Sequence, residues 1–273
     1  MNFIQVVVLG IVQGLTEFLP ISSSAHLVFV PFLFNWTLDP EKAFVFNVLV
    51  QLGTLVAVII YFWGDLVAIF QSAINGIKDK APFEKSESRL GWYIVLGTIP
   101  AGLAGLLLKS RVEEAFNSPQ LTAILLLGTA ILLVLAEILT RKEKDLDQLT
   151  WQDALFVGVF QALAIFPGIS RSGATISGGL FKGYNREAAA RYSFLLSIPI
   201  MLAAGLLSVI DLVRAEFFLE FLPALLLGFV IAGVVGYLSI RWLLGYLKKH
   251  SLIGFALYCV AISVLTIIVT VVR

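Results

Sequence analysis

The fold is decided by the stretch QGLTEFLPISSSAH, residues 13–26, which lies inside an apolar segment running from Phe3 to Phe34. Proline stops a helix at or near the preceding residue, so Pro20 divides this segment into two halves. Each half is roughly 15 residues, or about 22 Å as a helix, too short to cross the ~30 Å hydrocarbon core of a bilayer. We therefore expect a re-entrant hairpin with a broken tip at membrane depth, where irregular backbone must be buried in protein or line a wet cavity.

A second segment, from Trp151 to Phe181, is broken in the same way by Pro167-Gly168. It resembles the first at a constant offset of 148 residues, with seven identities in the 16 positions that begin at Leu9. The identical pairs are Gly10 and Gly158, Gln13 and Gln161, Leu15 and Leu163, Phe18 and Phe166, Ile21 and Ile169, Ser22 and Ser170, and Ser24 and Ser172. The sequence therefore predicts two related hairpins.

The composition indicates an integral membrane protein. Of 273 residues, 59% are hydrophobic and 14% charged, against roughly 45–50% and 25% in soluble domains. The net charge of +1 gives no strong positive potential that would attract nucleic acid. Cys259 is the single cysteine, so the chain can form no intrachain disulfide. We read no removable signal peptide at the N-terminus. Six further apolar runs, each about 20 residues, are long enough to span a membrane: Ala43–Trp63, Leu90–Lys109, Gln120–Thr140, Glu187–Ile210, Phe221–Leu244 and Leu252–Val272.

The order of these segments predicts an all-α polytopic membrane protein built as an inverted repeat. Residues 1–273 form one membrane domain, with repeat 1 at about 1–140 and repeat 2 at about 151–273, each a hairpin followed by three spans. A hairpin returns to its own side and three spans are an odd number, so the second copy enters from the opposite face. In such folds the broken helices meet near the midplane, and the site lies there.

The distribution of basic residues predicts the orientation. One side holds thirteen: Lys78, Lys80, Lys85, Arg89, Arg141, Lys142, Lys144, Lys182, Arg186, Arg191, Arg241, Lys248 and Lys249. The other holds five: Lys42, Lys109, Arg111, Arg214 and Arg273. The first side is therefore expected in the cytoplasm, with both termini outside.

Three ionisable residues lie at the hairpin tips, Glu17, His26 and Arg171, and such groups at membrane depth are costly and usually functional. Arg171 can hold a phosphate through two parallel hydrogen bonds, and the amides at a new helix start can bind an anion. The remaining candidates for diphosphate binding are Gln13, Ser22, Ser24, Ser170, Ser172 and Thr175, with Ser23 beside them as a catalytic candidate. This combination favours phosphoryl transfer over carbon chemistry.

Structural roles compete with this interpretation. The serine run after Pro20 fits an N-cap, His26 fits a structural histidine, and Glu17 fits a plain ion pair with Arg171. Gln13 and Gln161 fit side chains that form hydrogen bonds with unpaired backbone groups of the hairpins. The occurrence of these residues together in two related tips favours the functional interpretation.

The stretches QGLTEFLPISSSAH, residues 13–26, and PGISRSGATI, residues 167–176, resemble the two signature motifs of the bacterial undecaprenyl-diphosphate phosphatase family, the bacitracin-resistance protein type. The resemblance covers the whole chain in length, hairpin positions and span order. The first motif departs in places: members often have Glu at the position of Gln13 and Thr-Gly at Ser24-Ala25. Gln13 weakens a paired-carboxylate metal site but leaves the anion site intact.

The resemblance implies hydrolysis of undecaprenyl diphosphate to undecaprenyl phosphate and inorganic phosphate, which recycles the carrier lipid of peptidoglycan synthesis and bears on antibiotic resistance. It implies a site at the outer side of the cytoplasmic membrane and a homodimer. The residues it marks as functional are Glu17, His26, Ser170, Arg171 and Thr175, with Ser22 and Ser23 as nucleophile candidates.

Two mechanisms remain open at this point. Either Ser23 attacks phosphorus, with His26 as general acid and base, or a water aligned by Glu17 and His26 attacks. The i,i+3 spacing of Ser23 and His26 favours the serine narrowly. No metal-ligand cluster stands out, and Glu17 is the one candidate ligand for a divalent cation such as Mg²⁺ or Ca²⁺. The rival class is an inverted-repeat transporter or flippase of polyprenyl phosphate.

Overall fold

The computed structural model describes residues 1–116, 118–141, 143–213 and 218–272. Lys142, Arg214 and Arg273, which enter the count of basic residues above, lie outside the described residues. Every named element in the described residues is a helix, as predicted for an all-α membrane protein.

Both predicted hairpins consist of two short helices joined by a break. The first contains α1 (Phe3–Thr16) and α2 (Ser23–Leu33), and the second contains α8 (Trp151–Leu163) and α9 (Arg171–Phe181). None of these four helices exceeds 14 residues, which is about 21 Å of helix. The prediction that both segments break before crossing is therefore confirmed.

Six longer helices contain windows long and apolar enough to span a membrane, by length and composition. They are α3 (Pro40–Tyr61), α5 (Ser86–Leu107), α7 (Pro119–Leu139), α10 (Arg186–Val213), α11 (Phe218–Leu247) and α12 (Ile253–Val272). These helices coincide with the six predicted spans, so the chain is a multi-pass membrane protein. Two shorter α-helices, α4 (Trp63–Lys78) and α6 (Lys109–Phe116), and one turn of 3-10 helix, η1 (Leu146–Gln148), complete the described elements. α4 is not among the predicted elements, and it continues the chain past a bend at Phe62.

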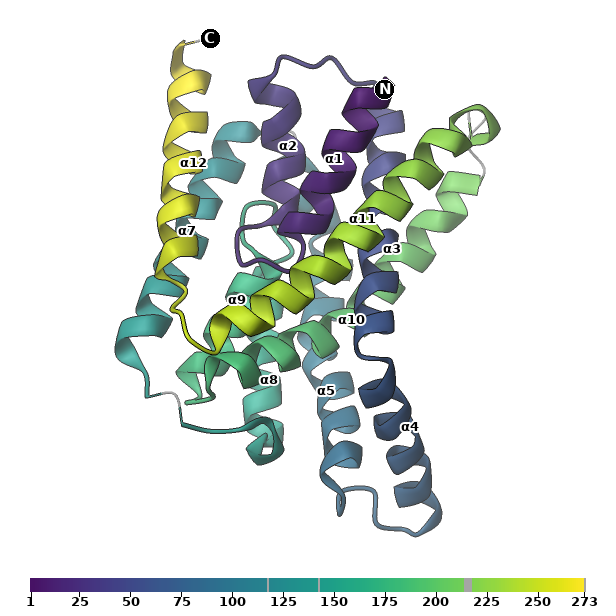
Figure 1. Ribbon diagram of the computed structural model, residues 1–273, viewed down its shortest axis with the longest axis vertical. Helices are drawn as coiled ribbons and strands as arrows, with labels where there is room; N and C mark the ends of the chain where they lie inside the picture. The colour runs from purple at the N-terminus through teal and green to yellow at the C-terminus, as the bar shows by residue number, and fades with distance from the viewer. Residues whose placement is uncertain (117, 142, 214–217, 273) are drawn as a thin grey trace.

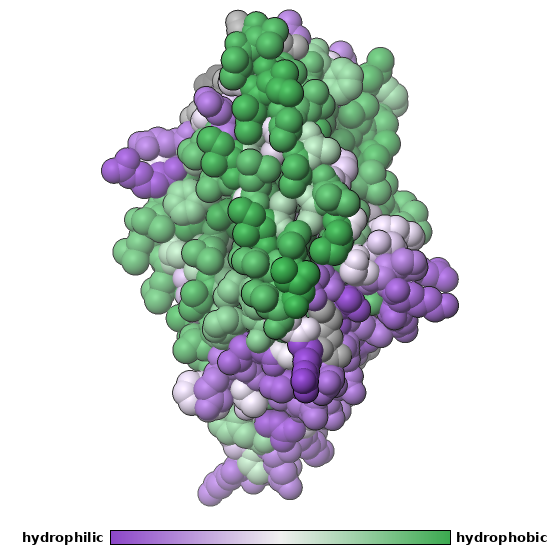
Figure 2. Space-filling view, turned by 90° about the vertical axis from the view of Figure 1, so that its left-hand side faces the viewer, coloured by the Kyte–Doolittle hydropathy of each residue, from purple (hydrophilic) through white to green (hydrophobic). Residues whose placement is uncertain are grey.

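The hairpins enter the molecule from opposite ends (Figure 1). α1 and α2 open toward the end that holds both termini, whereas α8 and α9 open toward the other end, beyond which α4 and the start of α5 project. The side on which α7 and α12 lie carries a broad apolar surface, with polar residues gathered below it (Figure 2). This apolar surface is the one expected to face lipid.

Glycines allow each hairpin to approach the other half of the chain. α1 packs against α11, and α8 packs against α5. A Cβ on Gly14 would lie 2.8 Å from the carbonyl oxygen of Ala232, and a Cβ on Gly158 would lie 2.5 Å from that of Gly97. The first helix of each hairpin thus packs on a long helix from the other half of the chain: α1 on α11, and α8 on α5.

A buried ion pair holds the lower ends of three long helices together. The Glu137 carboxylate on α7 accepts two hydrogen bonds from the Arg186 guanidinium on α10, at 2.8 and 2.7 Å. It also accepts one from the backbone N–H of Leu252, at 2.9 Å, just before α12. Because the Glu137 side chain is 4% exposed, its charge depends on these partners.

Candidate active site

The two hairpin tips meet inside the protein. Glu17, directly after α1, accepts a hydrogen bond of 2.7 Å at Oε1 from Nη2 of Arg171, the first residue of α9. The Ser172 hydroxyl donates to the carbonyl oxygen of Leu19 at 2.9 Å. The Glu17 side chain is 5% exposed and that of Arg171 is 17% exposed. The predicted juxtaposition of the arginine of one tip with the carboxylate of the other is therefore present.

The second oxygen of Glu17 organises its own hairpin. Glu17 Oε2 accepts from the Ser23 hydroxyl at 2.6 Å and from Gln13 Nε2 at 2.9 Å. The Gln13 amide also lies 3.4 Å from the hydroxyl of Thr54 on α3, and the i,i+4 spacing places Gln13 and Glu17 on one face. One carboxylate thus links the guanidinium of the other tip to a serine hydroxyl, which is an arrangement that can remove the serine proton.

The Arg171 guanidinium is only partly used by the protein. Among the described residues its Nη1 atom is buried without a hydrogen-bond partner, although a buried charged donor without an acceptor is costly. Arg171 opens α9, whose first amides have no intrahelical partner. A guanidinium with a free nitrogen at a helix start has the chemistry of an anion site.

Matching serines cap the second helix of each hairpin. The Ser22 hydroxyl accepts from the amide of Ala25 at 3.3 Å, and the Ser170 hydroxyl accepts from that of Gly173 at 3.1 Å. The hydroxyls of Ser22 and Ser24 lie 3.1 Å apart, and so do those at the corresponding positions of α9, Ser170 and Ser172. The sequence correspondence between the tips therefore extends to their local hydrogen bonds.

The backbone at each tip adopts a conformation that side chains rarely allow. Ser22 has a φ of 69°, which is uncommon for a residue with a Cβ and is often found at functional sites. Gly168 has a φ of 101°, and a Cβ there would lie 2.3 Å from the carbonyl oxygen of Thr122. Glycine is therefore required where the second tip turns against α7.

His26 has partners other than those expected. Its Nδ1 lies 2.8 Å from the carbonyl oxygen of Ser22, and its Nε2 lies 2.7 Å from the hydroxyl of Tyr258 on α12. The Ser23 hydroxyl points instead to Glu17. In this structure the group placed to take the Ser23 proton is thus the carboxylate, although the spacing favours the imidazole.

Thr175 is turned toward the protein interior. Its hydroxyl donates to the carbonyl oxygen of Arg171 at 2.7 Å and lies 2.6 Å from the hydroxyl of Ser193 on α10. Thr175 is 1% exposed. It therefore supports the α9 start rather than presenting a hydroxyl to the anion site.

Sequence reasoning missed four polar residues that surround the tips: Thr54, Thr129, Ser193 and Tyr258. The Thr129 hydroxyl on α7 accepts from the amide of Ser170 at 2.9 Å and donates to the carbonyl oxygen of Gly168 at 3.0 Å. Each of the four lies within an otherwise apolar span, which was the available signal.

The donor set of the tips suits an anion better than a metal ion. Among the described residues no group of three His, Cys, Asp or Glu side chains could hold a metal. Glu17 is the one carboxylate in the two connecting segments, and Arg171, Ser23 and Gln13 engage its oxygens. A divalent cation here would need phosphate oxygens of the substrate for most of its ligands.

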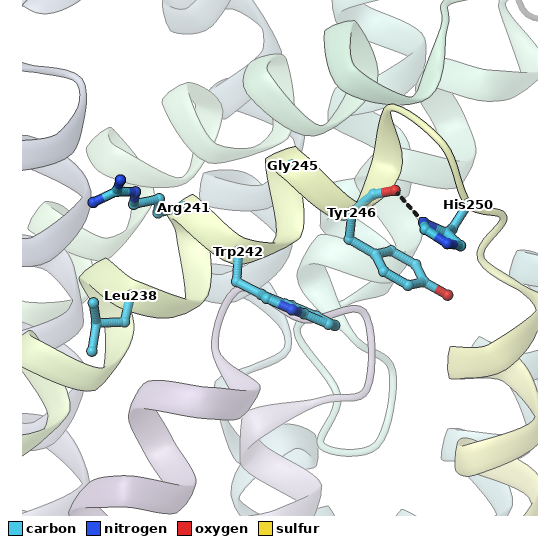
Figure 3. A pocket seen from close by; sticks show the side chains of 6 residues that line it. All are labelled: Leu238, Arg241, Trp242, Gly245, Tyr246 and His250. Atoms are coloured by element: carbon cyan, nitrogen blue, oxygen red, sulfur yellow. Dashed lines mark hydrogen bonds between the residues drawn. The ribbon is translucent and has the colours of Figure 1, made fainter.

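A surface hollow of about 540 Å³ lies elsewhere, along α11 (Figure 3), and contains none of the predicted site residues. The Trp242 and Tyr246 rings stack at 5.1 Å, and the Tyr246 and His250 rings stack at 4.4 Å. Such a row of amphipathic rings is typical of a membrane interface. We therefore assign this hollow to the membrane interface.

Comparisons with known proteins identify the family of the chain. The family model described as bacitracin resistance protein BacA matches residues 6–265. A protein of Chloroherpeton thalassium is 45% identical over 275 residues, covering 97% of this chain and 95% of the relative. One of Thermomicrobium roseum is 44% identical over 276 residues, covering 98% of each. Both relatives carry the name undecaprenyl-diphosphatase. With this match over nearly its whole length, the chain belongs to the bacitracin resistance protein BacA family.

Proposed function

We propose that this protein hydrolyses undecaprenyl diphosphate to undecaprenyl phosphate and inorganic phosphate. Its family and the activity named for its relatives support this proposal. The single observation that carries it is the chain of contacts from Ser23 through Glu17 to Arg171, with one guanidinium nitrogen left over. A nucleophile, a proton acceptor and a phosphate-binding cation are thereby held together in a protein built of membrane-spanning helices.

In the first step the Ser23 hydroxyl attacks the terminal phosphorus while its proton passes to Glu17. The bond from that phosphorus to the bridging oxygen breaks, and undecaprenyl phosphate leaves with the electron pair. In the second step water attacks the phosphoserine and gives up a proton to Nε2 of His26. The bond from phosphorus to the serine oxygen breaks, the serine oxygen takes back the proton from Glu17, and inorganic phosphate is released.

Arg171 links proton transfer to charge stabilisation. While Glu17 is ionised, it holds Nη2 of Arg171 at 2.7 Å. When Glu17 takes the serine proton, its attraction for the guanidinium falls, and both nitrogens become available to the phosphoryl oxygens. The positive charge therefore moves toward the phosphate as negative charge develops there, which is when such a donor lowers the barrier.

The wider assignments form part of the same proposal. The two halves are an inverted repeat, as the opposite entry of the hairpins and the matched packing of α1 and α8 suggest. The protein lies in the cytoplasmic membrane as a homodimer, with the site opening to the outer side. The thirteen-to-five bias of Lys and Arg supports both termini being outside, and cysteine labelling of intact cells at either terminus tests that orientation.

Phosphate release from undecaprenyl (C55) and farnesyl (C15) diphosphate by the purified protein tests the activity. We expect Ser23→Ala to lower kcat by ~10³-fold or more, since the nucleophile is lost. Ser24→Ala, the matched control in the same serine run, should lose less than ~10-fold. Rapid quenching followed by mass spectrometry should find phosphate on Ser23. Full activity in Ser23→Ala would refute the serine mechanism.

The same assay separates hydrolysis from transport. A transporter or flippase of polyprenyl phosphate moves lipid without releasing inorganic phosphate, whereas the proposed enzyme must release it in detergent, where no second membrane face exists. Absence of release by the purified wild-type protein would overturn the enzymatic proposal itself.

A further inference from the structure

Among the described residues, Tyr258 on α12 is the only one whose side chain forms a hydrogen bond with His26, and it comes from the far end of the chain. The phenol oxygen lies 2.7 Å from Nε2 of His26. The two rings are nearly parallel, with an interplanar angle of 6° and centroids 5.6 Å apart. The imidazole is thus held by the Ser22 backbone on one side and by a phenol on the other.

The first of these contacts fixes the tautomer of the neutral imidazole. A carbonyl oxygen only accepts hydrogen bonds, so the ring nitrogen facing the Ser22 carbonyl must carry a proton. That nitrogen is Nδ1. In the neutral ring Nε2 then holds the lone pair, and the Tyr258 hydroxyl donates to it. When Nε2 takes a proton, it donates to the phenol oxygen instead, so the same contact serves both protonation states.

Tyr258 meets the buried imidazole at its lone pair. His26 is 5% exposed, whereas Tyr258, on a helix of membrane-spanning length, is 43% exposed. A phenol that only filled space beside His26 would need no hydroxyl, and phenylalanine would stack as well. The hydroxyl lies at Nε2, the nitrogen that holds the lone pair of the neutral ring, which gives this side chain a chemical role.

We propose that Tyr258 is the positioning residue for His26: its hydroxyl holds the imidazole so that Nδ1 keeps the proton and Nε2 presents the lone pair as the working nitrogen. The inference rests on the proposed function, in which His26 takes the proton of the attacking water. In that step the water replaces the phenol at Nε2, because this nitrogen has a single lone pair, and the imidazolium then passes the proton to the released phosphate.

Other ionisable groups near His26 are few in the described elements. α12 contributes Cys259, whose thiol lies 3.8 Å from the carbonyl oxygen of Pro20. α7, which packs against α2 and α12, contributes Glu137, which is bound to Arg186. The tips contribute Glu17 and Arg171, which bind each other. A change in the titration of His26 on removal of the phenol would therefore report on the Tyr258 hydroxyl itself.

The activity test compares Tyr258→Phe with Tyr237→Phe, a matched removal of a half-exposed phenol hydroxyl on α11. Phosphate release from farnesyl diphosphate is measured across pH. We expect Tyr258→Phe to lower kcat by ~10-fold with KM changed by less than ~2-fold, and to alter the shape of the kcat profile against pH. Tyr237→Phe should follow the wild type. A kcat profile of Tyr258→Phe that superimposes on the wild type, or a change confined to KM, would overturn the inference.

A second measurement is independent of catalysis. The chain has two histidines, so His250→Gln leaves His26 as the sole signal in ¹⁵N spectra of labelled protein. We expect the Nδ1-protonated tautomer of the neutral ring, and a midpoint of titration that changes by ~0.5 pH or more when Tyr258→Phe is added. Unchanged spectra would overturn the inference even if the enzyme is active. Loss of phosphate release by the wild type would instead count against the proposed function, while the spectra would still test the tautomer.

Discussion

The two hairpins share one pattern of helix, break and helix, but the protein encloses them to different extents. In α9 every residue from Ser172 to Leu180 is buried, whereas in α2 only Ala25, His26 and Phe29 are buried. Corresponding glutamines differ as well: Gln13 donates to the Glu17 carboxylate, and Gln161 donates to a backbone carbonyl of α5. The first hairpin thus carries the groups proposed to react, whereas the second is the more enclosed of the two.

The base of the second hairpin is also tied by polar contacts. The Lys182 ammonium lies 3.2 Å from Asp153 Oδ1, and the Tyr184 hydroxyl donates to Asp153 Oδ2 at 2.8 Å. These contacts join the start of α8 to the segment after α9. The difference teaches that the more enclosed hairpin holds Arg171, and that the less enclosed hairpin holds Ser23 and His26, the proposed nucleophile and imidazole.

Removing the cation from the more enclosed hairpin should have the largest effect. We expect Arg171→Ala to lower kcat/KM by ~10³-fold or more, because a phosphate donor is lost and Glu17 is left unpaired. Arg171→Lys keeps the charge but has no second nitrogen to share, so it should recover only a small part of this loss. Phosphate release from farnesyl diphosphate checks both, and wild-type activity in Arg171→Lys would contradict the two-nitrogen role.

The corresponding glycines test whether the hairpins are equally tightly packed. A Cβ on Gly158 would lie 2.5 Å from the Gly97 carbonyl oxygen, whereas a Cβ on Gly10 would lie 3.2 Å from the Gly228 carbonyl oxygen. We expect Gly158→Ala to lower the free energy of unfolding by ~2–3 kcal/mol and Gly10→Ala by ~1 kcal/mol or less. Unfolding in detergent measures both, and equal losses would remove the packing difference between the hairpins.

Removing a polar contact at the base of the second hairpin should lower the unfolding free energy by less than Gly158→Ala does. Tyr184→Phe removes the bonds to Asp153 and to the Gln148 carbonyl oxygen, and we expect a loss of ~1–2 kcal/mol in unfolding free energy. Burial and the Asp153 carboxylate raise the pKa of Tyr184. Because the pKa of Tyr184 is higher in the folded protein than in the unfolded chain, its hydroxyl stabilises the fold fully below the unfolded pKa of about 10. This stabilisation is lost only as the pH rises above that value. The loss should therefore be the same at about pH 6 and pH 9, and a pH-dependent loss in that range would contradict this contact scheme.

Of the four predictions in this comparison, the substitution of Thr175 should change stability and activity least. Because its hydroxyl is used by Arg171 and Ser193, Thr175→Val should lower the unfolding free energy by ~0.5–1 kcal/mol. Its kcat/KM for farnesyl diphosphate should stay within ~10-fold of the wild type. A loss as large as that of Arg171→Ala, in a variant that still folds, would return Thr175 to the phosphate site predicted from the sequence.

The fold could be predicted because its signals are local. Pro20 and Pro167-Gly168 divide two apolar segments into halves that are too short to span, and six other runs have spanning length. α4 was missed because it is shorter than a span and follows α3 after a bend at the single residue Phe62. The meeting of Glu17 and Arg171 was expected from the proposed inverted repeat, in which two broken segments meet near the midplane.

The finer geometry of the site could not be predicted because it depends on the rotation of distant helices. Tyr258 reaches His26 across 232 residues of sequence, and no local pattern marks which face of α12 turns toward α2. The i,i+3 spacing placed Ser23 near His26, but the Ser22 carbonyl holds Nδ1 and the ring turns to Tyr258. Likewise Ser193 on α10 takes the hydroxyl of Thr175, which the α9 sequence alone does not reveal.

The meeting of the tips is tested most directly by cross-linking a cysteine pair, Leu19→Cys with Ser172→Cys, in a Cys259→Ser background that removes the single native thiol. The Ser172 hydroxyl lies 2.9 Å from the Leu19 backbone, so a short thiol-reactive linker should join the pair within one chain. The pair Leu19→Cys with Lys182→Cys, at the far end of α9, should stay unlinked. Failure to link the first pair, or equal linking of both, would contradict the account.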